Sequence, residues 1–389
     1  MIGVDRARII YAGLNKFLQH LASPLLGRHK EYNSVHGRFC HNTKLCGFVM
    51  TKNVAIVYWG SRGGGPRHLL NLVRSKQKED SQLFFYVSSN NELIHELQAE
   101  AGSQLEIASI PHSKFRVLTD LRSRKSAIKK VIADFEDKEI SRVYFLLPHP
   151  WDLYLAKKIM NKGEIEVWRG IHDLKRHPGD VWPNSFTIRR LIKYSNNLVC
   201  FSSYIEKQLL RHGKTIVRSH LFEVNRESKG VALDGSVLFV GRIRKYKGLV
   251  LLARAWPLIT NSKKSLTVAG AGRITPELQR IGVRLINRWL TNSEIDNLIR
   301  KSNLVVMPHV EASQSGVIAI AHSLSTPVVV TPVGGLMGQV IEGRNGIIAA
   351  SVTPESLAAA IDNALATQWS LESEENPLPH FLADLQKFI

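Results

Sequence analysis

Cysteine is scarce in this sequence, and its apolar runs are short. The 389 residues include three cysteines, Cys40, Cys46 and Cys200. These are too few for a disulfide framework, and the histidines near the first two lack the spacing of zinc ligands. We therefore expect reduced thiols in a cytoplasmic protein. No apolar run reaches the roughly 18 residues that cross a bilayer, so no membrane-spanning helix is predicted.

Acidic residues are outnumbered as well. The chain has 33 Asp and Glu against 52 Lys and Arg, a formal net charge of +19. Such an excess attracts nucleic acid, anionic lipid or phosphorylated ligands, and composition alone leaves these three open. With 44% hydrophobic and 22% charged residues, the chain has the composition of a globular protein. A fibrous or wholly disordered chain is excluded.

Residues 1–49 differ in pattern from the rest of the chain. Their apolar residues fall on one face of a predicted helix, with Arg and Lys nearby. Two interpretations stay open. The segment is either an amphipathic extension that lies on an anionic membrane, or a mis-assigned start of a chain that begins at Met50. The residues of the apolar face are Ile10, Leu14, Phe17, Leu18, Leu21 and Leu25.

From Met50 onward, short β-branched or aromatic runs alternate with longer amphipathic stretches. This alternation is typical of βαβ units and parallel sheets. We predict an α/β protein with two doubly wound, Rossmann-like domains that face a cleft, at 50–222 and 235–370. A polar linker, Phe222–Asp234, joins them, and 371–389 forms a helical tail. The predicted strands are Val54–Tyr58, Leu83–Val87, Val143–Leu147, Leu198–Phe201, Val237–Val240, Leu266–Ala269, Val283–Ile286, Leu304–Met307 and Val328–Val330.

Two segments of the second domain have the residues of an anion or sugar site. Gly241–Gly248 follows a predicted strand with a glycine, clustered cations and a helix start, which suits a phosphate; the alternative is a solvated basic turn. Glu311, after the strand Leu304–Met307, is followed by Ser315-Gly316 at a helix start. A carboxylate beside free backbone amides suits a polyol attached to a phosphate, the alternative being a structural helix cap.

The motifs of residues 235–350, and their order along the chain, resemble the donor-binding domain of GT-B glycosyltransferases of the retaining family 4 type. The glycine-rich loop at Gly63-Gly64-Gly65 and the segment from His172 to Asp180 resemble the first domain of the same enzymes, so the resemblance covers roughly 52–365. The motifs that carry it in the second domain are Gly241-Arg242 with Lys247-Gly248, Ala269-Gly270-Ala271-Gly272, Glu311 with Gly316 and Thr326-Pro327-Val328-Val329, Gly334-Gly335 and Gly343-Arg344-Asn345-Gly346.

The resemblance implies a role for each matching residue. Arg242 and Lys247 would hold the donor diphosphate, Glu311 would accept from the donor sugar, and His172 would lie near the anomeric carbon. The other donor-binding residues would be Gly64, Gly65, Gly241 and Gly270, which let the backbone approach, and the backbone amides of Ser315, Gly316 and Val317. Arg288 would lie beside the nucleotide base within the segment Asn287-Arg288-Trp289. His177 and His309 are left as structural.

One position departs from the family pattern. The family has a second glutamate on the ribose, and the equivalent residue here is Ala319 or Ile320, neither of which is acidic. Recognition of the ribose is therefore put in doubt, whereas phosphate binding is not. The missing acid also keeps a non-catalytic partner subunit of the same fold as an alternative.

The expected function is transfer of a sugar from a nucleoside diphosphate sugar to an acceptor, with retention of configuration. No Asp-x-Asp pair occurs in the chain, so we expect no metal and no other cofactor, the cations over the diphosphate taking the metal's place. The expected acceptor is a cell-envelope glycan or a lipid-linked saccharide.

A basic cluster from Lys114 to Lys130 has seven cations and one acid, Asp120. It would dock on anionic lipid at the inner face of the membrane, or else form a solvated helix face.

Other classes fit less well. A dinucleotide-dependent oxidoreductase is disfavoured because the first-strand loop has no Gly-x-Gly-x-x-Gly run and Ser88-Ser89-Asn90, not an acid, follows the second strand. No nucleic acid partner is expected, since no basic-aromatic module or helix-turn-helix pattern is present. A nucleotide-sugar epimerase or hydrolase of the same fold stays open.

Overall fold

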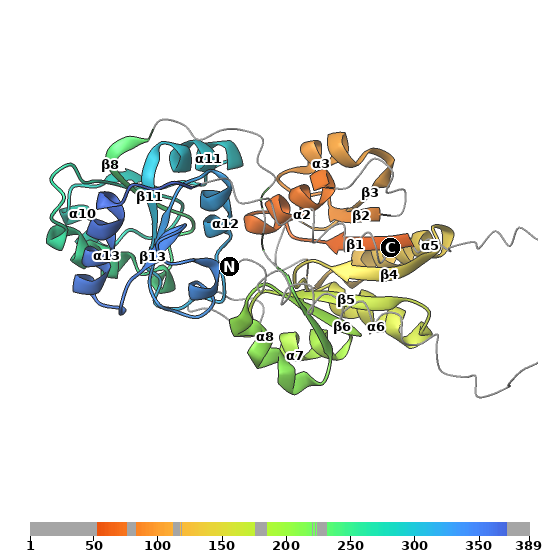
Figure 1. Cartoon of the computed structure of the whole chain (residues 1–389). Helices are drawn as coiled ribbons and strands as arrows, with labels where there is room; N and C mark the ends of the chain where they lie inside the picture. The colour runs from red at the N-terminus through yellow and green to blue at the C-terminus, as the bar shows by residue number, and fades with distance from the viewer. Residues whose placement is uncertain are drawn as a thin grey trace, which may run out of the picture.

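The computed structural model describes residues 53–75, 83–111, 117, 119–175, 185–219, 221, 223 and 232–371. The described chain forms two parallel sheets, of seven and six strands, each covered by helices (Figure 1). The predicted α/β class with two doubly wound domains is confirmed. The predicted extension at 1–49 lies outside the described residues, and so does the tail beyond Leu371.

The first sheet has the strand order β3-β2-β1-β4-β5-β6-β7, and all its pairs are parallel. The direction of winding reverses between β1 and β4, where open sheets of this kind bind ligands beyond the carboxyl ends of the strands. The strands are β1 Asn53–Tyr58, β2 Leu83–Ser88, β3 Leu105–Ala108, β4 Ile140–Phe145, β5 Glu166–Ile171, β6 Asn197–Cys200 and β7 Thr215–Arg218. The helices are α2 Gly64–Ser75, α3 Ile94–Ala101, α5 Leu121–Asp137, α6 Asp152–Lys162, α7 Ser185–Lys193 and α8 Ser203–Leu209, with 3-10 turns η2 Gly102–Gln104 and η3 Leu210–His212.

Helices bury both faces of this sheet. Along β1, Val54 and Ile56 pack with α2 and α3, whereas Ala55 and Val57 pack with α5 and α6 on the other face. Successive side chains of a strand point to opposite faces, so a strand covered on both sides has apolar residues at every position. This explains why β1 is an unbroken apolar run after Asn53.

The second sheet has the order β10-β9-β8-β11-β12-β13, again all parallel. Its winding reverses between β8 and β11. The strands are β8 Leu233–Val240, β9 Ser265–Ala269, β10 Arg284–Ile286, β11 Ser302–Met307, β12 Val328–Val330 and β13 Gly346–Ile348. The helices are α9 Leu249–Ala255, α10 Pro276–Arg280, α11 Asn292–Arg300, α12 Gly316–Ser323 and α13 Pro354–Ala366, with 3-10 turns η4 Lys245–Lys247, η5 Trp256–Leu258 and η6 Met337–Gln339.

Each predicted strand overlaps an observed one, but four strands were not predicted. These are β3, β5, β7 and β13. The strand β5 was missed because it contains Glu166 and Arg169, and charged residues seldom occupy a sheet centre. Several boundaries also differ: for example, β4 ends at Phe145 rather than Leu147, and β8 begins at Leu233, within the predicted linker.

The carboxyl ends of the two sheets face each other. In Figure 1, α2 of the first domain lies next to α11 and α12 of the second. Arg67 of α2 joins the domains, since its Nε lies 2.7 Å from Glu223 and its Nη1 2.8 Å from Asp296 of α11. Both Arg67 and Glu223 are largely buried, so this ion triad fixes α2 against the second domain.

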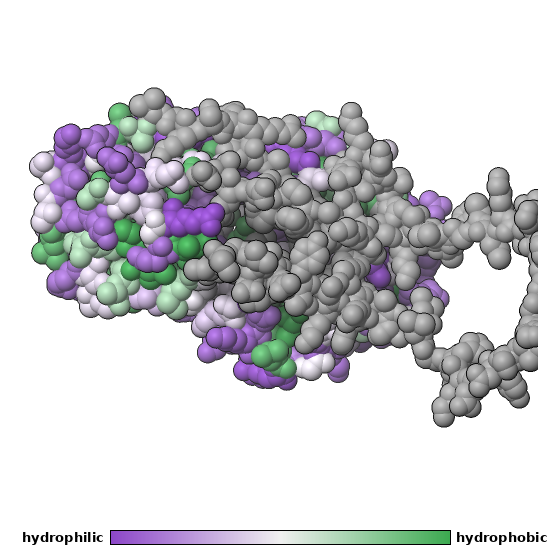
Figure 2. Space-filling model, viewed as in Figure 1, coloured by the Kyte–Doolittle hydropathy of each residue, from purple (hydrophilic) through white to green (hydrophobic). Residues whose placement is uncertain are grey.

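The outer surface of the second domain is mixed. On the face visible in Figure 2, hydrophilic residues are interspersed with smaller apolar areas. Such a surface is normal for a globular domain.

Candidate active site

The loop after β8 is shaped by two glycines. Gly241 ends the strand at φ 132°, and Gly248 at φ 72° precedes α9. A Cβ at Gly248 would lie 1.6 Å from the carbonyl oxygen of Pro308, so only glycine allows the loop to approach the segment after β11. The short turn η4 between these glycines presents the predicted cations at the carboxyl end of the sheet.

The two predicted cations lie in this loop. Arg242 is exposed, and Lys247 is half-buried with its Nζ 2.7 Å from Nε2 of His309. An ammonium only donates hydrogen bonds, so Nε2 of His309 accepts. Lys247 also lies 5.3 Å from the centre of the Tyr246 ring. His309 was expected to be structural, yet it orients Lys247, and only the fold brings these two residues together.

Gly270 lies directly beside Gly241. A Cβ on Gly270 would be 1.9 Å from the Gly241 carbonyl oxygen, and its own amide donates to Ile286. Gly270 thus supports the loop after β8 by packing its backbone closely against Gly241. Its predicted role at the donor is indirect in this geometry, since its amide is already paired.

The loop after β11 presents Glu311 and the start of α12. Glu311 is exposed. Gly316 begins α12 with no heavy atom within 4 Å of where a Cβ would lie, so the helix start is open to an approaching group. Val317 is half-buried and packs on the core of the second domain, which leaves its backbone as the part available to a ligand.

Ser315 differs from the expectation. Its amide donates to Oε1 of Gln339 at 2.7 Å, and Nε2 of Gln339 donates back to the Ser315 carbonyl at 3.0 Å. The buried Ser315 backbone is therefore already satisfied. This corrects the prediction that its amide is offered to a phosphate or sugar: Ser315 orients the start of α12 instead.

His172 follows β5 and comes from the opposite domain. Its ring stacks on Phe201, with centroids 4.2 Å apart and an interplanar angle of 28°, and meets the edge of His68 at 6.2 Å. Its Nδ1 lies 2.9 Å from Nε2 of Gln314, in the loop after β11. Burial lowers the pKa of His172 to about 4, so the imidazole is neutral at physiological pH.

The glycine-rich loop after β1 also reaches the second domain. Gly64 begins α2 and has open space at its Cβ position, whereas a Cβ on Gly65 would overlap the hydroxyl of Tyr58 at 2.2 Å. The amide of Gly63 donates to Oε1 of Glu92 at 2.8 Å, and Nε1 of Trp289 donates to Oε2 of the same carboxylate at 3.1 Å. Glu92 therefore bridges the two domains at this loop.

Arg288 is engaged within its own domain. Its guanidinium contacts both carboxylate oxygens of Glu294, at 3.0 and 2.5 Å, and Glu294 closes the capping box of α11 with Thr291. This holds the pKa of Glu294 at about 2. Trp289, the next residue of the segment predicted beside the base, is 39% exposed.

Glu311 opens onto a recess between the domains. The recess is open, of about 280 Å³, and its lining is mostly polar. The first domain contributes Leu174, Lys175, Tyr204, Ile205 and Gln208, and the second contributes Glu311, Ala312 and Ser313. Lys175, in the loop after β5, and Tyr204 and Gln208, on α8, were not predicted from the sequence, because nothing in a lone polar residue marks it as facing a carboxylate in another domain.

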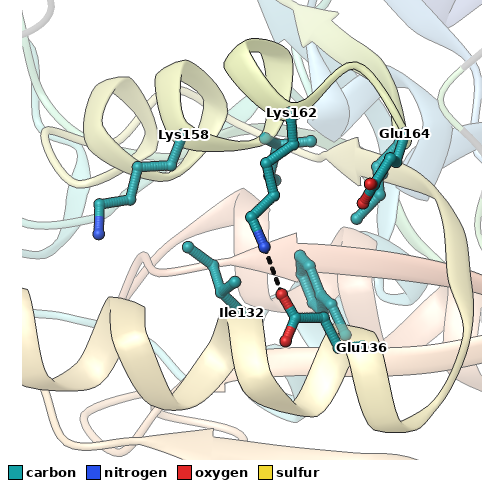
Figure 3. A pocket seen from close by; sticks show the side chains of 8 residues that line it. Ile132, Glu136, Lys158, Lys162 and Glu164 are labelled. Atoms are coloured by element: carbon teal, nitrogen blue, oxygen red, sulfur yellow. Dashed lines mark hydrogen bonds and ion pairs between the residues drawn. The ribbon is translucent and has the colours of Figure 1, made fainter.

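A second recess, of about 300 Å³, lies between α5 and α6 (Figure 3). Ile132 and other apolar side chains line it, and the ion pair of Lys162 with Glu136 spans it between the two helices. Glu136 and Glu164 precede β4 and β5, so the recess lies at the amino ends of the strands. Ligands of doubly wound sheets bind at the other end, and this recess is no part of the candidate site.

Within the described ranges, no three His, Cys, Asp or Glu side chains are grouped as metal ligands. No helix of the described chain is long and apolar enough to span a membrane.

Comparison with known proteins bears on these geometries. Residues 234–367 match the family model described as "Glycosyl transferases group 1". An uncharacterized glycosyltransferase of Methanocaldococcus jannaschii is 27% identical over 331 residues, 80% of this chain and 88% of the relative. A second one from the same organism is 33% identical over 151 residues, 36% of this chain and 38% of the relative.

Two further proteins show how the similarity is distributed. A D-inositol 3-phosphate glycosyltransferase of Catenulispora acidiphila is 32% identical over 179 residues, 41% of this chain and 39% of that enzyme. The two matches above 30% identity thus span less than two-fifths of the length of those relatives. The crystal structure of Anabaena HepE in complex with UDP superposes with a TM-score of 0.64 at 14% identity, covering 87% of this chain and all of that one. Residues 234–367 are therefore similar to a group 1 glycosyltransferase domain, and the described chain has the GT-B fold.

Proposed function

We propose that this protein transfers a sugar from a nucleoside diphosphate sugar to an acceptor bound by the first domain. The observation that carries the proposal is the meeting of loops across the cleft. Arg242 and Lys247 lie after β8, Glu311 lies after β11, and His172 reaches the same loop from the opposite sheet. Cations for a diphosphate, a carboxylate for sugar hydroxyls and a neutral imidazole are the groups that this reaction needs.

The electrostatic requirement is specific. As the glycosidic bond to the donor breaks, negative charge grows on the diphosphate and positive charge on the sugar ring. Fixed cations beside the leaving group stabilise that state more than the ground state, which is how a binding group becomes a catalytic one. We assign this role to Arg242 and Lys247.

A nucleotide screen tests the proposal. Anabaena HepE was solved with UDP, so UDP and GDP are the first probes. We expect one of them to raise the melting temperature of the protein, and the matching sugar nucleotide to be hydrolysed slowly without acceptor. Stabilisation without any turnover would favour the non-catalytic partner subunit, and conversion of the sugar within the intact nucleotide would favour an epimerase.

Retention of configuration is part of the proposal and rests on the family resemblance. Glu311 would accept hydrogen bonds from the donor sugar in the recess it shares with Lys175 and Tyr204. The anomeric configuration of the product, read by NMR against that of the donor, tests it. An inverted product would contradict the retaining assignment and leave the transfer assignment intact.

Metal independence gives a second prediction. The chain has no Asp-x-Asp pair, and the loop Gly241–Gly248, with its cations, is where we expect the diphosphate to bind. We therefore expect sugar transfer to keep its rate in excess EDTA. The measurement compares initial rates with EDTA, with EDTA plus excess Mg²⁺, and with neither. Loss of activity with EDTA that Mg²⁺ restores would refute this part of the proposal.

We propose that the acceptor is a lipid-linked or cell-envelope saccharide met at the cytoplasmic face of a membrane. Support comes from a basic surface on the first domain, made by α5, α6 and α7. Its exposed cations are Arg122, Lys125, Lys129, Lys130, Lys157, Lys158, Arg189, Arg190 and Lys193. Exposed apolar side chains accompany them, Leu121 at 60% and Phe186 at 64%. Cations beside exposed apolar groups suit the interface of an anionic bilayer. Lys114 and Arg116 of the predicted cluster lie outside the described residues.

Vesicle binding tests this surface. Each cation near an anionic bilayer contributes about 1 kcal/mol. The variant Arg122→Glu/Lys125→Glu/Lys129→Glu should therefore bind vesicles that contain phosphatidylglycerol at least a hundredfold more weakly than the unaltered protein. The matched control, Arg254→Glu/Lys263→Glu/Lys301→Glu, changes the charge equally at exposed positions of the second domain and should bind normally. Equal losses in both variants, or no vesicle binding at all at physiological salt, would refute the docking surface.

A further inference from the structure

The contact between Gln314 and His172 decides where the imidazole carries its proton. Nε2 of Gln314 lies 2.9 Å from Nδ1 of His172. An amide nitrogen donates hydrogen bonds and does not accept them. Nδ1 is therefore the acceptor, and a neutral imidazole whose Nδ1 accepts has its proton on Nε2.

The surroundings of His172 keep it neutral. The titratable groups that face it are Asp173, next to it in the chain, and His68 on α2. Burial lowers the pKa of His172 to about 4, and the opposing effect of Asp173 is smaller. The pKa of His68 also falls, to about 3, by burial and by the nearby His172. Phe201 covers one face of the His172 ring, and the burial it contributes to outweighs the effect of Asp173, so the imidazole stays neutral.

The Nε2 atom of His172 is buried and has no hydrogen-bond partner among the described residues, and the same holds for Oε1 of Gln314. A buried polar group without a partner destabilises the folded state. Such groups are uncommon in native structures, and a ligand or ordered water that binds the group is one explanation. These two lie in the interdomain cleft, beside the loop of Glu311 and Gly316.

We propose that Gln314 is a positioning residue that reaches across the cleft to fix His172 as a neutral hydrogen-bond donor through Nε2. The donor then serves an oxygen of the bound substrate, and His172 does not act as a base. The identity of that oxygen rests on the proposed function, but the tautomer does not.

The contact also links the imidazole to the position of the two domains. Gln314 belongs to the second domain and His172 to the first, so the hydrogen bond exists only while the domains are closed. Opening the cleft removes the donor on Nδ1 and leaves the ring free to exchange tautomers. The imidazole is thus correctly protonated for its role only in the closed arrangement.

The tautomer can be measured directly. Long-range proton–nitrogen NMR on the ¹⁵N-histidine-labelled full chain, with His172→Gln to assign the signal, distinguishes a protonated Nε2 from a protonated Nδ1. We expect Nε2–H and no titration between pH 5.5 and 8. A wild-type signal with the proton on Nδ1, or a ring that titrates near pH 6.5, would overturn the proposal.

Three variants complete the test. A carboxylate only accepts here, so Gln314→Glu should move the proton to Nδ1 and raise the pKa of His172, whereas Gln314→Ala should leave mixed tautomers. Gln279→Glu adds the same charge at an exposed site on α10 and should change neither. An unchanged tautomer in Gln314→Glu would also overturn the proposal.

Activity supplies an independent readout. Gln314→Glu should lower kcat about tenfold or more with little change in the KM of the donor, and its rate should acquire a pH dependence that the wild type lacks. If every protein including the wild type fails to transfer sugar while the tautomer shifts as expected, the proposed function fails and the positioning role stands. If transfer proceeds and Gln314→Glu keeps the wild-type kcat and pH profile, the positioning role fails alone.

Discussion

Replacing Arg242 or Lys247 by alanine should lower the rate of sugar transfer about a hundredfold or more. Both residues lie in the loop after β8, one exposed and one held by His309 at 2.7 Å. Removing a single preorganised electrostatic donor from a developing anion raises a barrier by about 2.7–4 kcal/mol in a comparable case. Because this charge exists mainly in the transition state, kcat should fall more than the affinity for the donor.

The adjacent Lys245 provides the matched control. It lies in the same turn and is exposed, but the resemblance assigns it no contact with the diphosphate. Lys245→Ala should keep transfer within about twofold of the wild-type rate. Initial rates of transfer and of donor hydrolysis measure all three variants, with melting temperatures to exclude unfolding. If Arg242→Ala and Lys247→Ala both work at near wild-type rates, the loop does not bind the diphosphate.

The fold could be predicted because its signal is local and repeated. A strand buried on both faces, such as β1 or β12, is an apolar run that needs no knowledge of its neighbours. The missed strands lack this feature. The edge strands β3 and β7 are only partly buried, and β5 carries an arginine whose partner is distant in the sequence. Strand order likewise depends on contacts that no local pattern records.

Only those site residues that belong to a local sequence motif could be predicted. Glycines and cations after β8 are adjacent in the sequence, so their pattern indicated a phosphate loop. Partners of these residues come from other elements: His309 for Lys247, Gln314 for His172, Gln339 for Ser315. Nothing in the spacing of these residues marks them, since the fold brings them together over long separations. The corrected role of Ser315 follows from the same cause.

The arginine in β5 forms a buried ion pair next to the loop after β4. Arg169 and Asp152 have side chains 0% and 1% exposed, and their Nη1 and Oδ2 atoms lie 3.1 Å apart. Oδ2 of Asp152 also accepts the amide of His149, while Nε of Arg169 donates to Ser195. Burial raises the pKa of Asp152 to about 7, against the opposing effect of Arg169. The pair therefore anchors the loop after β4, which lies at the carboxyl end of the first sheet.

Removing one member of this pair should destabilise the protein strongly. Asp152→Leu leaves the Arg169 guanidinium buried without a counterion, and breaking a buried pair in this way typically lowers stability by about 3–5 kcal/mol. The double variant Asp152→Leu/Arg169→Met replaces both charges by apolar groups and should recover most of that loss, because the desolvation of two charges disappears with them. Urea unfolding of the two single variants, Asp152→Leu and Arg169→Met, and of the double variant measures the coupling. If the single changes are as mild as changes at the exposed pair of Lys263 and Asp234, whose side chains are 71% and 70% exposed, the anchoring role is refuted. A double variant that folds as stably as the wild type but transfers sugar more slowly would show that the charges themselves orient the loop after β4.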